Sequence, residues 1–568
     1  MSRLSDKREI QVLVTLLAQH GLKHVVVSPG SRHAPLSLSF HGHPNIDVFV
    51  VPDERAAGYF ALGIAQATQV PVAVVCTSGT AALNYGPAIA EAFYQEIPLF
   101  VITADRPKEW IDQSDGQTIR QSGVHQLHTL GSFDYLAEAE HRDEQRQNER
   151  IINAAWMLAD GLVKGPVHIN VPLREPLYGL TVETPAQGRP VQQIAHPSIP
   201  KKEELHELHE VLRSHKRILV LTGMSAPDAE LNRALVKFSE ASGALVLTET
   251  GSNVNGKHFV PCIDRLLMGM DDALLNDLSP DLLITFGSNI VSKKVKAFIR
   301  QAAPDEHWHL DRAGRMLDTF KCLTRAIACE PSAMLDALST GLNGSSYGQQ
   351  FAAVDRALSN QMHAELERTP WSDLLAFDKV LQKLPAQSIL QMGNSSVVRY
   401  IQLFDQRPDL VYYGNRGTSG IDGCTATASG MAVVSAKPVT LISGDIAFLY
   451  DVNGLWHSGD RSKLKIVLIN NGGGNIFKII EGPSDSDALE TLFEARHSLD
   501  AKHIAAHFGI GYLTARNAPE LENQLDALFA AAECTVLEVF TREVANENVL
   551  KDLFKTLKAT NPFNYGNT

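Results

Sequence analysis

The sequence predicts an α/β protein of three consecutive domains, each with a mainly parallel sheet flanked by helices. Short runs rich in Val, Ile and Leu recur along the chain, bounded by Gly, Ser, Asp or Pro and separated by helix-length segments. This pattern is typical of buried parallel strands in βαβ units. The chain has 568 residues, of which 44% are hydrophobic. A single hydrophobic core does not usually extend over a chain of this length, which indicates about three to four domains.

The strand-like runs form three blocks. We expect strands at 24–27, 48–51, 70–76, 99–103 and 167–171 in the first block, at 218–222, 244–248, 282–286 and 307–310 in the second, and at 388–391, 410–413, 439–443, 466–469 and 535–540 in the third. Residues 183–202, rich in proline and polar side chains, are typical of a linker, and residues 341–350, rich in Gly and Ser, of a flexible junction. The expected domains therefore span residues 1–184, 203–340 and 351–568.

The N-terminal segment predicts an amphipathic helix. Asp6 and Glu9 have the spacing of a capping box, residues 10–17 are mostly apolar, and Gly21 provides a stop signal. A signal peptide would need an unbroken apolar core and a small-residue cleavage site. No run approaches about 18 apolar residues, the length that a membrane-spanning helix needs.

Charge and cysteine content exclude several classes of protein. Lys and Arg number 51 against 64 Asp and Glu, and the net charge of −13 opposes phosphate backbones and anionic lipid. The six cysteines lack CxxC spacing, which argues against zinc, iron–sulfur clusters or a disulfide framework. We therefore expect a cytoplasmic protein without nucleic-acid or membrane partners. We interpret Cys76 and Cys424 as small apolar core residues, with a nucleophile role as the alternative.

Two strand ends in the third block carry residues suited to a metal ion. One strand ends at Asp445, and the next, after one helix-length crossover, ends in the Asn-Asn-Gly-Gly-Gly run of residues 470–474. The carboxyl ends of neighbouring parallel strands share one edge of a sheet, so we expect Asp445 and Asn471 side by side. A carboxylate, a carboxamide and a backbone carbonyl suit octahedral magnesium, and the glycines allow close approach of a diphosphate. Gly-Asp and Asn-Asn-Gly are also ordinary turn formers, which is the alternative.

The pair of strand ends resembles the thiamin diphosphate signature, which opens Gly-Asp-Gly and closes Asn-Asn. Enzymes of that superfamily also need a first-domain carboxylate that hydrogen-bonds the aminopyrimidine ring of the cofactor. Here strand 48–51 leads directly into Pro52, Asp53 and Glu54, and Glu54 is the candidate catalytic and cofactor-binding residue. The alternative is that Asp53 or Glu54 is a helix N-terminal carboxylate favoured by the macrodipole.

Further motifs make the resemblance specific. These motifs are SPGSR (28–32), DER (53–55), TSGT (77–80), TADRP (103–107), IRQ (119–121), EPLY (175–178), GNS (393–395), VR (398–399), NRG (415–417) and SGIDG (419–423). With them the chain resembles the family of 2-succinyl-5-enolpyruvyl-6-hydroxy-3-cyclohexene-1-carboxylate synthases of menaquinone biosynthesis. The middle domain matches weakly, at Gly287-Ser288 and Lys293-Lys294, and we expect it to be mainly a scaffold.

The resemblance implies a fold, a reaction and a cofactor. First and third domains would have the thiamin diphosphate-binding fold, with Mg²⁺ or Mn²⁺ beside the cofactor. The enzyme, a transferase, would decarboxylate 2-oxoglutarate and add the succinyl semialdehyde unit to isochorismate in a conjugate sense. The implied cofactor-binding residues are Glu54, Ser395, Ile421, Gly444, Asp445, Asn471 and Gly473, of which Asp445, Asn471 and Gly473 bind the metal; Asn470 is the alternative side-chain ligand. A homodimer or homotetramer is also implied, in which Glu54 of one subunit faces the metal motif of another.

Both implied substrates are dicarboxylates, so the site needs several positively charged side chains although the protein as a whole is acidic. Arginine gives bidentate carboxylate recognition, although each arginine taken singly also fits a surface ion pair. The candidate substrate residues are Ser31, Arg32, Arg106, Gln117, Lys293, Arg399, Arg416, Ile476, Phe477 and Ile480, with Lys294 as the alternative to Lys293. Ile421 resembles the bulky residue that supports the bent cofactor in this family; the alternative is an ordinary core residue. The apolar residues Ile476, Phe477 and Ile480 would exclude water from the site.

Several residues depart from the family pattern. The metal loop lacks a third Asn, its spacing from Asp445 is one residue short, and Gly116 precedes Gln117 where an Asn is familiar. Residues 456–460 are polar, so the helix before them is expected to be short. The rival interpretations are another thiamin diphosphate-dependent 2-oxoacid decarboxylase or acetolactate-type synthase, which would not need so many arginines, and a noncatalytic binding protein on the same fold.

Overall fold

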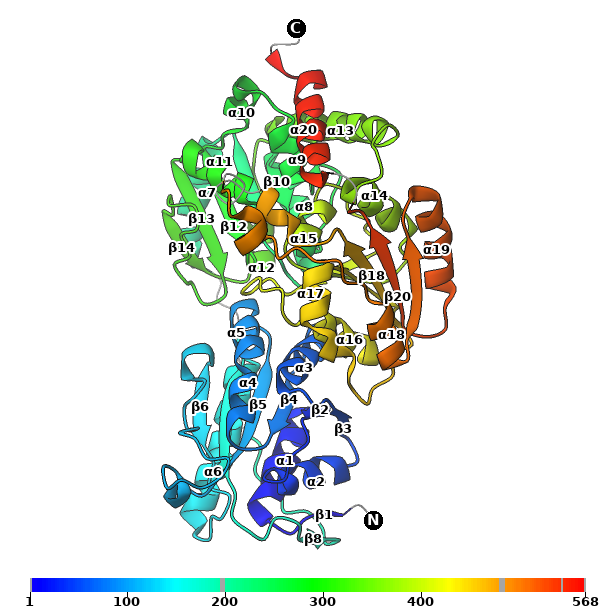
Figure 1. Cartoon of the computed structure of the whole chain (residues 1–568). Helices are drawn as coiled ribbons and strands as arrows, with labels where there is room; N and C mark the ends of the chain where they lie inside the picture. The colour runs from blue at the N-terminus through cyan, green and yellow to red at the C-terminus, as the bar shows by residue number, and fades with distance from the viewer. Residues whose placement is uncertain (1–2, 195–199, 480–485, 543–544, 566–568) are drawn as a thin grey trace.

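The computed structural model describes residues 3–194, 200–479, 486–542 and 545–565. It contains three six-stranded sheets, and every strand pair within them is parallel. Helices flank each sheet (Figure 1). The three-sheet α/β prediction is confirmed, whereas the exact domain limits stay a prediction.

The first sheet has the strand order β3-β2-β4-β5-β7-β6. Its strands are β2 (His24–Val27), β3 (Asp47–Val50), β4 (Val72–Cys76), β5 (Leu99–Asp105), β6 (Gly131–Asp134) and β7 (Val167–Pro172). One face packs against α1 (Arg8–His20), α2 (Ala34–Gly42) and α6 (Arg142–Ala159), the other against α3 (Glu54–Thr68), α4 (Thr80–Asn84) and α5 (Gly86–Gln95). A short antiparallel pair, β1 (Leu4–Ser5) with β8 (Leu180–Thr181), joins the two ends of this domain.

The middle sheet has the order β11-β10-β9-β12-β13-β14. Its strands are β9 (Ile218–Thr222), β10 (Leu245–Thr248), β11 (Phe259–Val260), β12 (Leu282–Phe286), β13 (Glu306–Asp311) and β14 (Arg325–Ala328). One face packs against α7 (Lys202–Ser214), α8 (Ala229–Ser242) and α12 (Pro331–Leu338), the other against α9 (Ile263–Met268), α10 (Asp272–Leu278), α11 (Lys293–Ala302) and α13 (Tyr347–Leu366). Helix α13 thus covers the middle sheet although it spans the expected start of the third domain.

The third sheet has the order β16-β15-β17-β18-β20-β19. Its strands are β15 (Ile389–Met392), β16 (Val411–Gly414), β17 (Val439–Gly444), β18 (Leu464–Asn470), β19 (Gly511–Ala515) and β20 (Thr535–Phe540). On one face lie α14 (Asp373–Lys383), α15 (Ser396–Ile401), α19 (Ala518–Ala530) and α20 (Asn546–Thr560), and on the other α16 (Cys424–Val434), α17 (Asp445–Tyr450) and α18 (Lys502–Phe508). Apolar residues of the middle and third domains join in one continuous core.

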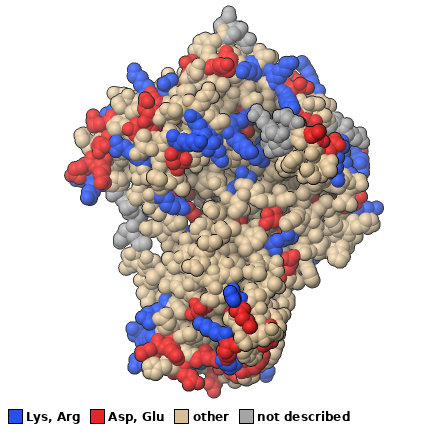
Figure 2. Space-filling view, turned by 60° about the vertical axis from the view of Figure 1, so that its left-hand side comes forward, with Lys and Arg blue, Asp and Glu red and all other residues tan. Residues whose placement is uncertain are grey.

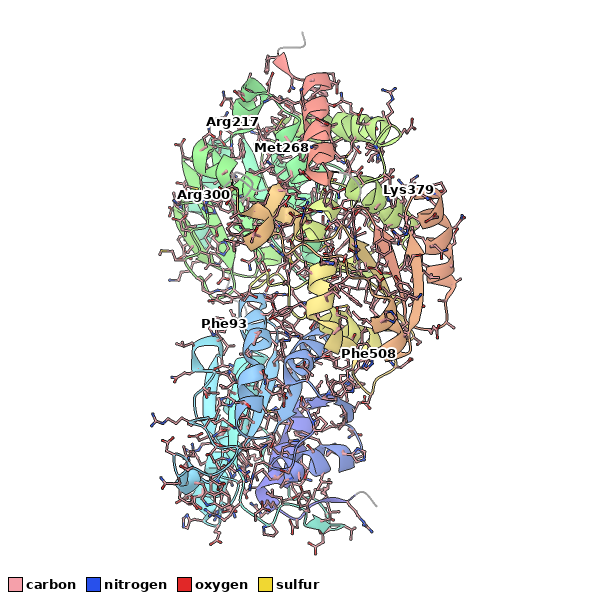
Figure 3. The ribbon with its side chains drawn as sticks, in the orientation of Figure 1. Phe93, Arg217, Met268, Arg300, Lys379 and Phe508 are labelled. Carbon is pink, nitrogen blue, oxygen red and sulfur yellow. The ribbon has the colours of Figure 1, made fainter. Side chains whose placement is uncertain are left out.

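The first domain lies below the other two in Figure 1 and meets the third through α3 and α16. These two helices pack closely because glycines face the other backbone: a Cβ on Gly63 would lie 2.0 Å from the carbonyl oxygen of Thr427, and one on Gly430 would lie 1.9 Å from that of Phe60. Phe93 on α5 lies at the junction with the upper domains (Figure 3). There it lines a cavity of about 540 Å³ together with Phe286 of the middle domain.

All fourteen expected strands are present, with ends shifted by at most two residues. Among the described residues, four strands of the six-stranded sheets were not expected, β6, β11, β14 and β19, and neither was the short pair of β1 and β8. Each forms an edge of its sheet, and edge strands are only partly buried, so their sequences lack a continuous apolar run. Around α17 the prediction of a short helix is confirmed, since the helix ends at Tyr450.

The N-terminal helix begins differently from the expectation. The capping box of Asp6 and Glu9 is wrong: α1 begins at Arg8, its N-cap is Lys7, and no side chain caps it. Glu9 is instead buried and accepts a hydrogen bond from Asn148 at 2.8 Å. The stop at Gly21 is confirmed, with a left-handed φ of 113°. No helix in the described part of the chain is long and apolar enough to cross a membrane.

Candidate active site

Asp445 and the glycine-rich loop after β18 lie together. Asp445 begins α17 and is 3% exposed. One carboxylate oxygen accepts hydrogen bonds from the backbone N–H groups of Gly472 (2.8 Å) and Gly473 (3.1 Å), and the other from that of Ile446 (2.7 Å). Strands β17 and β18 pair in register up to Gly444, so the two strand ends meet at one sheet edge.

The adjacent residues Asn470 and Asn471 differ in how their side chains are used. The Asn470 amide donates to Leu499 and Glu538, and its oxygen accepts from Gly472 and Arg542. The Asn471 amide donates to Asp373 at 2.8 Å, but its buried Oδ1 has no hydrogen-bond partner among the described residues. Buried polar atoms are almost always paired in native proteins. An unpaired Oδ1 beside Asp445 is therefore a free oxygen ligand.

Asp373 orients Asn471, and sequence analysis did not find it. It lies in the first turn of α14 and accepts hydrogen bonds from the Asn471 amide and the Thr541 hydroxyl. Burial raises the pKa of Asp373 to about 6. It is distant from the metal loop in sequence and belongs to no local motif, so only the tertiary structure reveals it.

A cavity of about 250 Å³ adjoins this loop. Of the candidate residues, it is lined by Ser395, Ile421, Gly444, Asp445, Asn471, Gly473 and Phe477. Ser395 has a φ of 67° and a ψ of −124°, a conformation that costs energy for a non-glycine residue and is concentrated at functional sites. All the described residues that line this cavity lie between residues 373 and 495.

A second cavity, of about 420 Å³, is lined by several positively charged side chains. It is lined by the candidates Lys293, Lys294, Arg399 and Ile476, and also by Asp264, Leu550 and Phe554. Ser396 lines both cavities, so they are neighbours. The middle domain thus supplies side chains to this cavity and is more than the scaffold that we expected.

The two third-domain arginines have different surroundings. Arg399 lines the second cavity, and its guanidinium donates to the carbonyl of Ser395. Arg416 is 6% exposed and donates to Asn394 at 2.8 Å, while its Nε has no hydrogen-bond partner among the described residues. Burial lowers the pKa of both guanidinium groups. Arg416 lines neither cavity, but Asn394, to which it donates, lines the first.

The loop that carries Arg416 is held by residues of the other two domains. Glu91 of α5 is 1% exposed and accepts hydrogen bonds from the N–H groups of Gly417 and Thr418, both at 2.7 Å, and from the Thr418 hydroxyl at 2.6 Å. Asn289 of the middle domain donates to the carbonyls of Arg416 (2.6 Å) and Gly417 (2.8 Å). All three domains therefore fix this loop.

The first-domain candidates form a separate cluster. Arg106 donates to Gln117 at 3.4 Å, and Arg32 donates to the carbonyl of Leu173 at 3.0 Å. Trp110 lies between the two arginines, with its ring 5.7 Å from the guanidinium of Arg32 and 5.9 Å from that of Arg106. Ser31 is exposed in the adjoining turn. Trp110 was not found by sequence analysis, and Ile480 lies outside the described residues.

Glu54 begins α3, where Asp53 serves as the N-cap and accepts from Ala56 at 3.2 Å. Burial raises the pKa of Glu54. The next residue, Arg55, donates to the carbonyl of Tyr450 at 2.9 Å, which lies at the far end of α17 from Asp445. Glu54 does not line the Asp445 cavity of its own chain.

Three family models match the chain in order. The N-terminal domain that binds thiamine pyrophosphate, a synonym of thiamin diphosphate, matches residues 9–129, the middle domain of such enzymes matches residues 191–392, and the C-terminal thiamine pyrophosphate-binding domain matches residues 391–539.

Curated relatives match nearly the whole chain. The 2-succinyl-5-enolpyruvyl-6-hydroxy-3-cyclohexene-1-carboxylate synthases of Flavobacterium johnsoniae and Flavobacterium psychrophilum are 41% and 40% identical, each over 96% of this chain and 98% of its own length. The synthase of Bacteroides fragilis is 35% identical over 98% of this chain and 100% of its own. The chain belongs to this synthase family.

Membership of the synthase family makes the chain a thiamin diphosphate-dependent enzyme that forms carbon–carbon bonds. Its cofactor is thiamin diphosphate with a divalent metal ion. The structure fits both groups: the unpaired Oδ1 of Asn471 and the carboxylate of Asp445 are hard oxygen donors. At Gly473 a Cβ would approach the carbonyl oxygen of Glu494 to 2.9 Å, so this position of the loop favours glycine.

Cys76 and Cys424 are buried and unbridged. Burial raises the pKa of the Cys76 thiol well above its ordinary value and that of Cys424 to about 12. A thiol with a raised pKa is a poor nucleophile, and these surroundings favour the interpretation of both as core residues.

Proposed function

We propose that this enzyme decarboxylates 2-oxoglutarate and adds the succinyl semialdehyde unit to isochorismate. The products are 2-succinyl-5-enolpyruvyl-6-hydroxy-3-cyclohexene-1-carboxylate and CO₂. The observation that carries the proposal is the pair of adjoining cavities, one with the free oxygen of Asn471 beside Asp445 and the other lined by Lys293, Lys294 and Arg399. The first fits the cofactor, and the second fits a dicarboxylate.

Residues of the third domain would hold the cofactor and its metal ion, Mg²⁺ or Mn²⁺. Asp445, Asn471 and the carbonyl of Gly473 would bind the metal, because the side-chain oxygen of Asn470 is already occupied. Ser395 and Ile421 line the same cavity and would contact the cofactor. When bound, thiamin diphosphate supplies an electron-accepting carbon that makes loss of CO₂ feasible.

Other residues would bind the substrates and exclude water. Lys293 and Arg399 would bind substrate carboxylates, while Ile476 and Phe477 provide apolar walls. Arg32, Arg106 and Gln117 would contribute from the first domain. Glu54 would exchange a proton with the pyrimidine ring of the cofactor, and its raised pKa suits a group that carries that proton.

A second copy of the chain would complete the site. The separation of Glu54 from the Asp445 cavity within one chain supports this proposal. Large apolar side chains of the first and third domains are exposed: Val50 by 38%, Tyr450 by 54% and Trp456 by 54%. On the face in Figure 2, Lys and Arg gather over the upper domains, and few charged side chains lie where the first domain meets them. An uncharged band of this kind is typical of a protein interface.

The six unbridged cysteines support a cytoplasmic location.

Mixing two inactive variants tests this arrangement. Glu54→Gln and Asp445→Ala should each abolish turnover, whereas a mixed dimer would contain one site with both native residues. We expect the equilibrated mixture to recover about a quarter of native activity, because about half of random dimers are mixed and each has one intact site of two. Recovery of no activity, in a mixture of isotopically labelled and unlabelled variants shown by native mass spectrometry to exchange subunits, would contradict the shared site.

The reaction itself is tested by supplying the native enzyme with thiamin diphosphate, Mg²⁺ and 2-oxoglutarate, with and without isochorismate. We expect CO₂ release coupled to consumption of both substrates. CO₂ release at the same rate with and without isochorismate, and no consumption of isochorismate, would identify a plain decarboxylase instead. Glu54→Gln should lose CO₂ release while it still binds the cofactor with reduced affinity in calorimetry.

A further inference from the structure

Glu249 is a buried carboxylate between the middle and third domains. It follows β10, is 1% exposed, and forms no ion pair with Lys or Arg in the described part of the chain. One carboxylate oxygen accepts a hydrogen bond from the backbone N–H of Ser292 at 3.0 Å, and the other accepts from the side-chain amide of Gln402. A buried carboxylate that no Lys or Arg contacts directly is costly unless its oxygens accept such hydrogen bonds.

The two donors belong to the two elements that carry the cavity's cations. Ser292 is the N-cap of α11, and Lys293 and Lys294 follow it directly. Gln402 is the C-cap of α15, one turn after Arg399. Lys293, Lys294 and Arg399 all line the second cavity. Through its two oxygens Glu249 therefore joins the lysine pair of one domain to the arginine of another.

Asp264 supports the same junction from α9. Its carboxylate accepts a hydrogen bond from the Ser292 hydroxyl and lines the second cavity. Glu249 and Asp264 both attract the guanidinium of Arg399 electrostatically, and this attraction opposes the effect of burial, which lowers the pKa of Arg399. The two carboxylates thus offset part of the repulsion among cations gathered in one cavity.

We propose that Glu249 is a positioning residue for the substrate site, which fixes the Lys293–Lys294 end of α11 relative to Arg399 so that the cavity binds a dicarboxylate. The inference rests on the proposed function. A carboxylate suits this role because both of its oxygens accept hydrogen bonds. An amide in its place would lose the negative charge, and it would keep both hydrogen bonds only if the Gln402 amide turned over to present its oxygen.

The experiment is equilibrium binding of isochorismate to the cofactor-loaded enzyme without 2-oxoglutarate, so that no turnover occurs. Glu249→Gln should raise the Kd of isochorismate by about 10-fold, the loss expected for one hydrogen bond to a charged group. The Kd of thiamin diphosphate should change less than about twofold, because Glu249 does not line the cofactor cavity. In turnover the effect should fall on KM more than on kcat.

The double variant Glu249→Gln with Gln402→Glu exchanges the carboxylate and the amide and restores the hydrogen bond between them. We expect it to bring the isochorismate Kd back to within about threefold of native. Gln402→Met removes the donor of the same hydrogen bond and leaves Glu249 in place. It is the variant to measure if Glu249→Gln does not fold. Glu240→Gln, an exposed acidic position on α8, is the matched control and should bind as the native enzyme does.

Three results would overturn the inference. The first is a native isochorismate Kd in Glu249→Gln. The second is equal loss of isochorismate and cofactor binding that the exchange variant does not restore, which would indicate a structural role alone. The third is a native enzyme that neither binds isochorismate nor consumes it together with 2-oxoglutarate, which would refute the proposed function and the inference with it.

Discussion

Asn470 and Asn471 are neighbours in sequence, yet the fold uses their side chains differently. Asn470 links β18 to Leu499, Glu538 and Arg542. Asn471 is oriented by Asp373 so that its Oδ1 stays unpaired beside Asp445. The first is therefore expected to contribute to stability and the second to metal binding.

Exchanging each asparagine for alanine separates these roles. Asn471→Ala should weaken metal-dependent cofactor binding by about 100-fold or more, since one of few metal ligands is lost, with little change in Tm. Asn470→Ala should lower the Tm by about 3–6 °C, because several buried groups lose partners. Calorimetric titration and thermal unfolding measure the two effects. Equal effects of both variants on cofactor affinity would contradict the assignment.

Asp451 is a buried carboxyl at the junction of the first and third domains. It is 0% exposed, and one of its oxygens accepts from the backbone N–H of Ala426 at 2.9 Å. The other oxygen has no hydrogen-bond partner among the described residues and lies 3.9 Å from Arg55. Burial raises the pKa of Asp451 to about 7.

This raised pKa gives the stability a predictable dependence on pH. A carboxyl with a raised pKa in the folded state makes the fold less stable as the pH rises from the ordinary carboxyl pKa of about 4 to the folded pKa of about 7, and the loss is complete above that range. Asp451→Asn cannot ionise, so its Tm should exceed the native Tm by about 2–6 °C at pH 8 and by less at pH 5. Thermal unfolding at the two pH values measures this difference, and a difference that does not grow with pH would refute it.

At the scale of elements, the loop between β16 and α16 carries two candidate site residues, Arg416 and Ile421. It contains no regular structure, and its conformation is fixed by Glu91 of α5 and Asn289 of the middle domain. Because the donors and acceptors come from three domains, the position of this loop depends on their correct assembly.

Thr418 allows one hydrogen bond of this clamp to be removed alone. Thr418→Val keeps the shape of the side chain but removes the hydroxyl that donates to Glu91, and it should lower kcat/KM by about 5- to 10-fold. Thr418→Ser keeps the hydroxyl and should remain close to native. Steady-state kinetics with both substrates measures the effect. Equal activity of the Val and Ser variants would show that the clamp does not act on the site.

At the scale of the whole molecule, the first domain is anchored to the third of the same chain, although its Glu54 does not line that chain's Asp445 cavity. The anchor is the close packing of α3 on α16, reinforced by the hydrogen bond from Asn453 to Asp53 at 2.8 Å. A rigid junction would hold Glu54 in place for the site of a second copy.

The glycines of this junction provide a test. Gly63→Ala would place a Cβ 2.0 Å from the Thr427 carbonyl oxygen, so α3 and α16 must separate, at a cost of about 2–3 kcal/mol. We expect a lower Tm and faster proteolysis between the domains. Gly86→Ala on α5 is the matched control, because no atom lies within 4 Å of its Cβ position. A native Tm in Gly63→Ala would show that the junction is not closely packed in solution.

Local sequence determined much of this protein. Central strands are buried on both faces, so their continuous apolar runs are visible in the sequence, whereas the edge strands β6 and β14 are not. Asp445 and Asn471 could be placed together because carboxyl ends of adjacent parallel strands share one edge. Motif resemblance then indicated the family that the relatives establish.

Only the tertiary structure decided which groups surround those residues. Asp373, Glu91 and Glu249 belong to no local motif, and each acts on a loop or helix from a distant part of the chain. The structure also separated Glu54 from the Asp445 cavity of its own chain. The physical reason is that strand and turn preferences are encoded within a few residues, whereas burial and hydrogen bonding of a carboxylate depend on how whole domains pack.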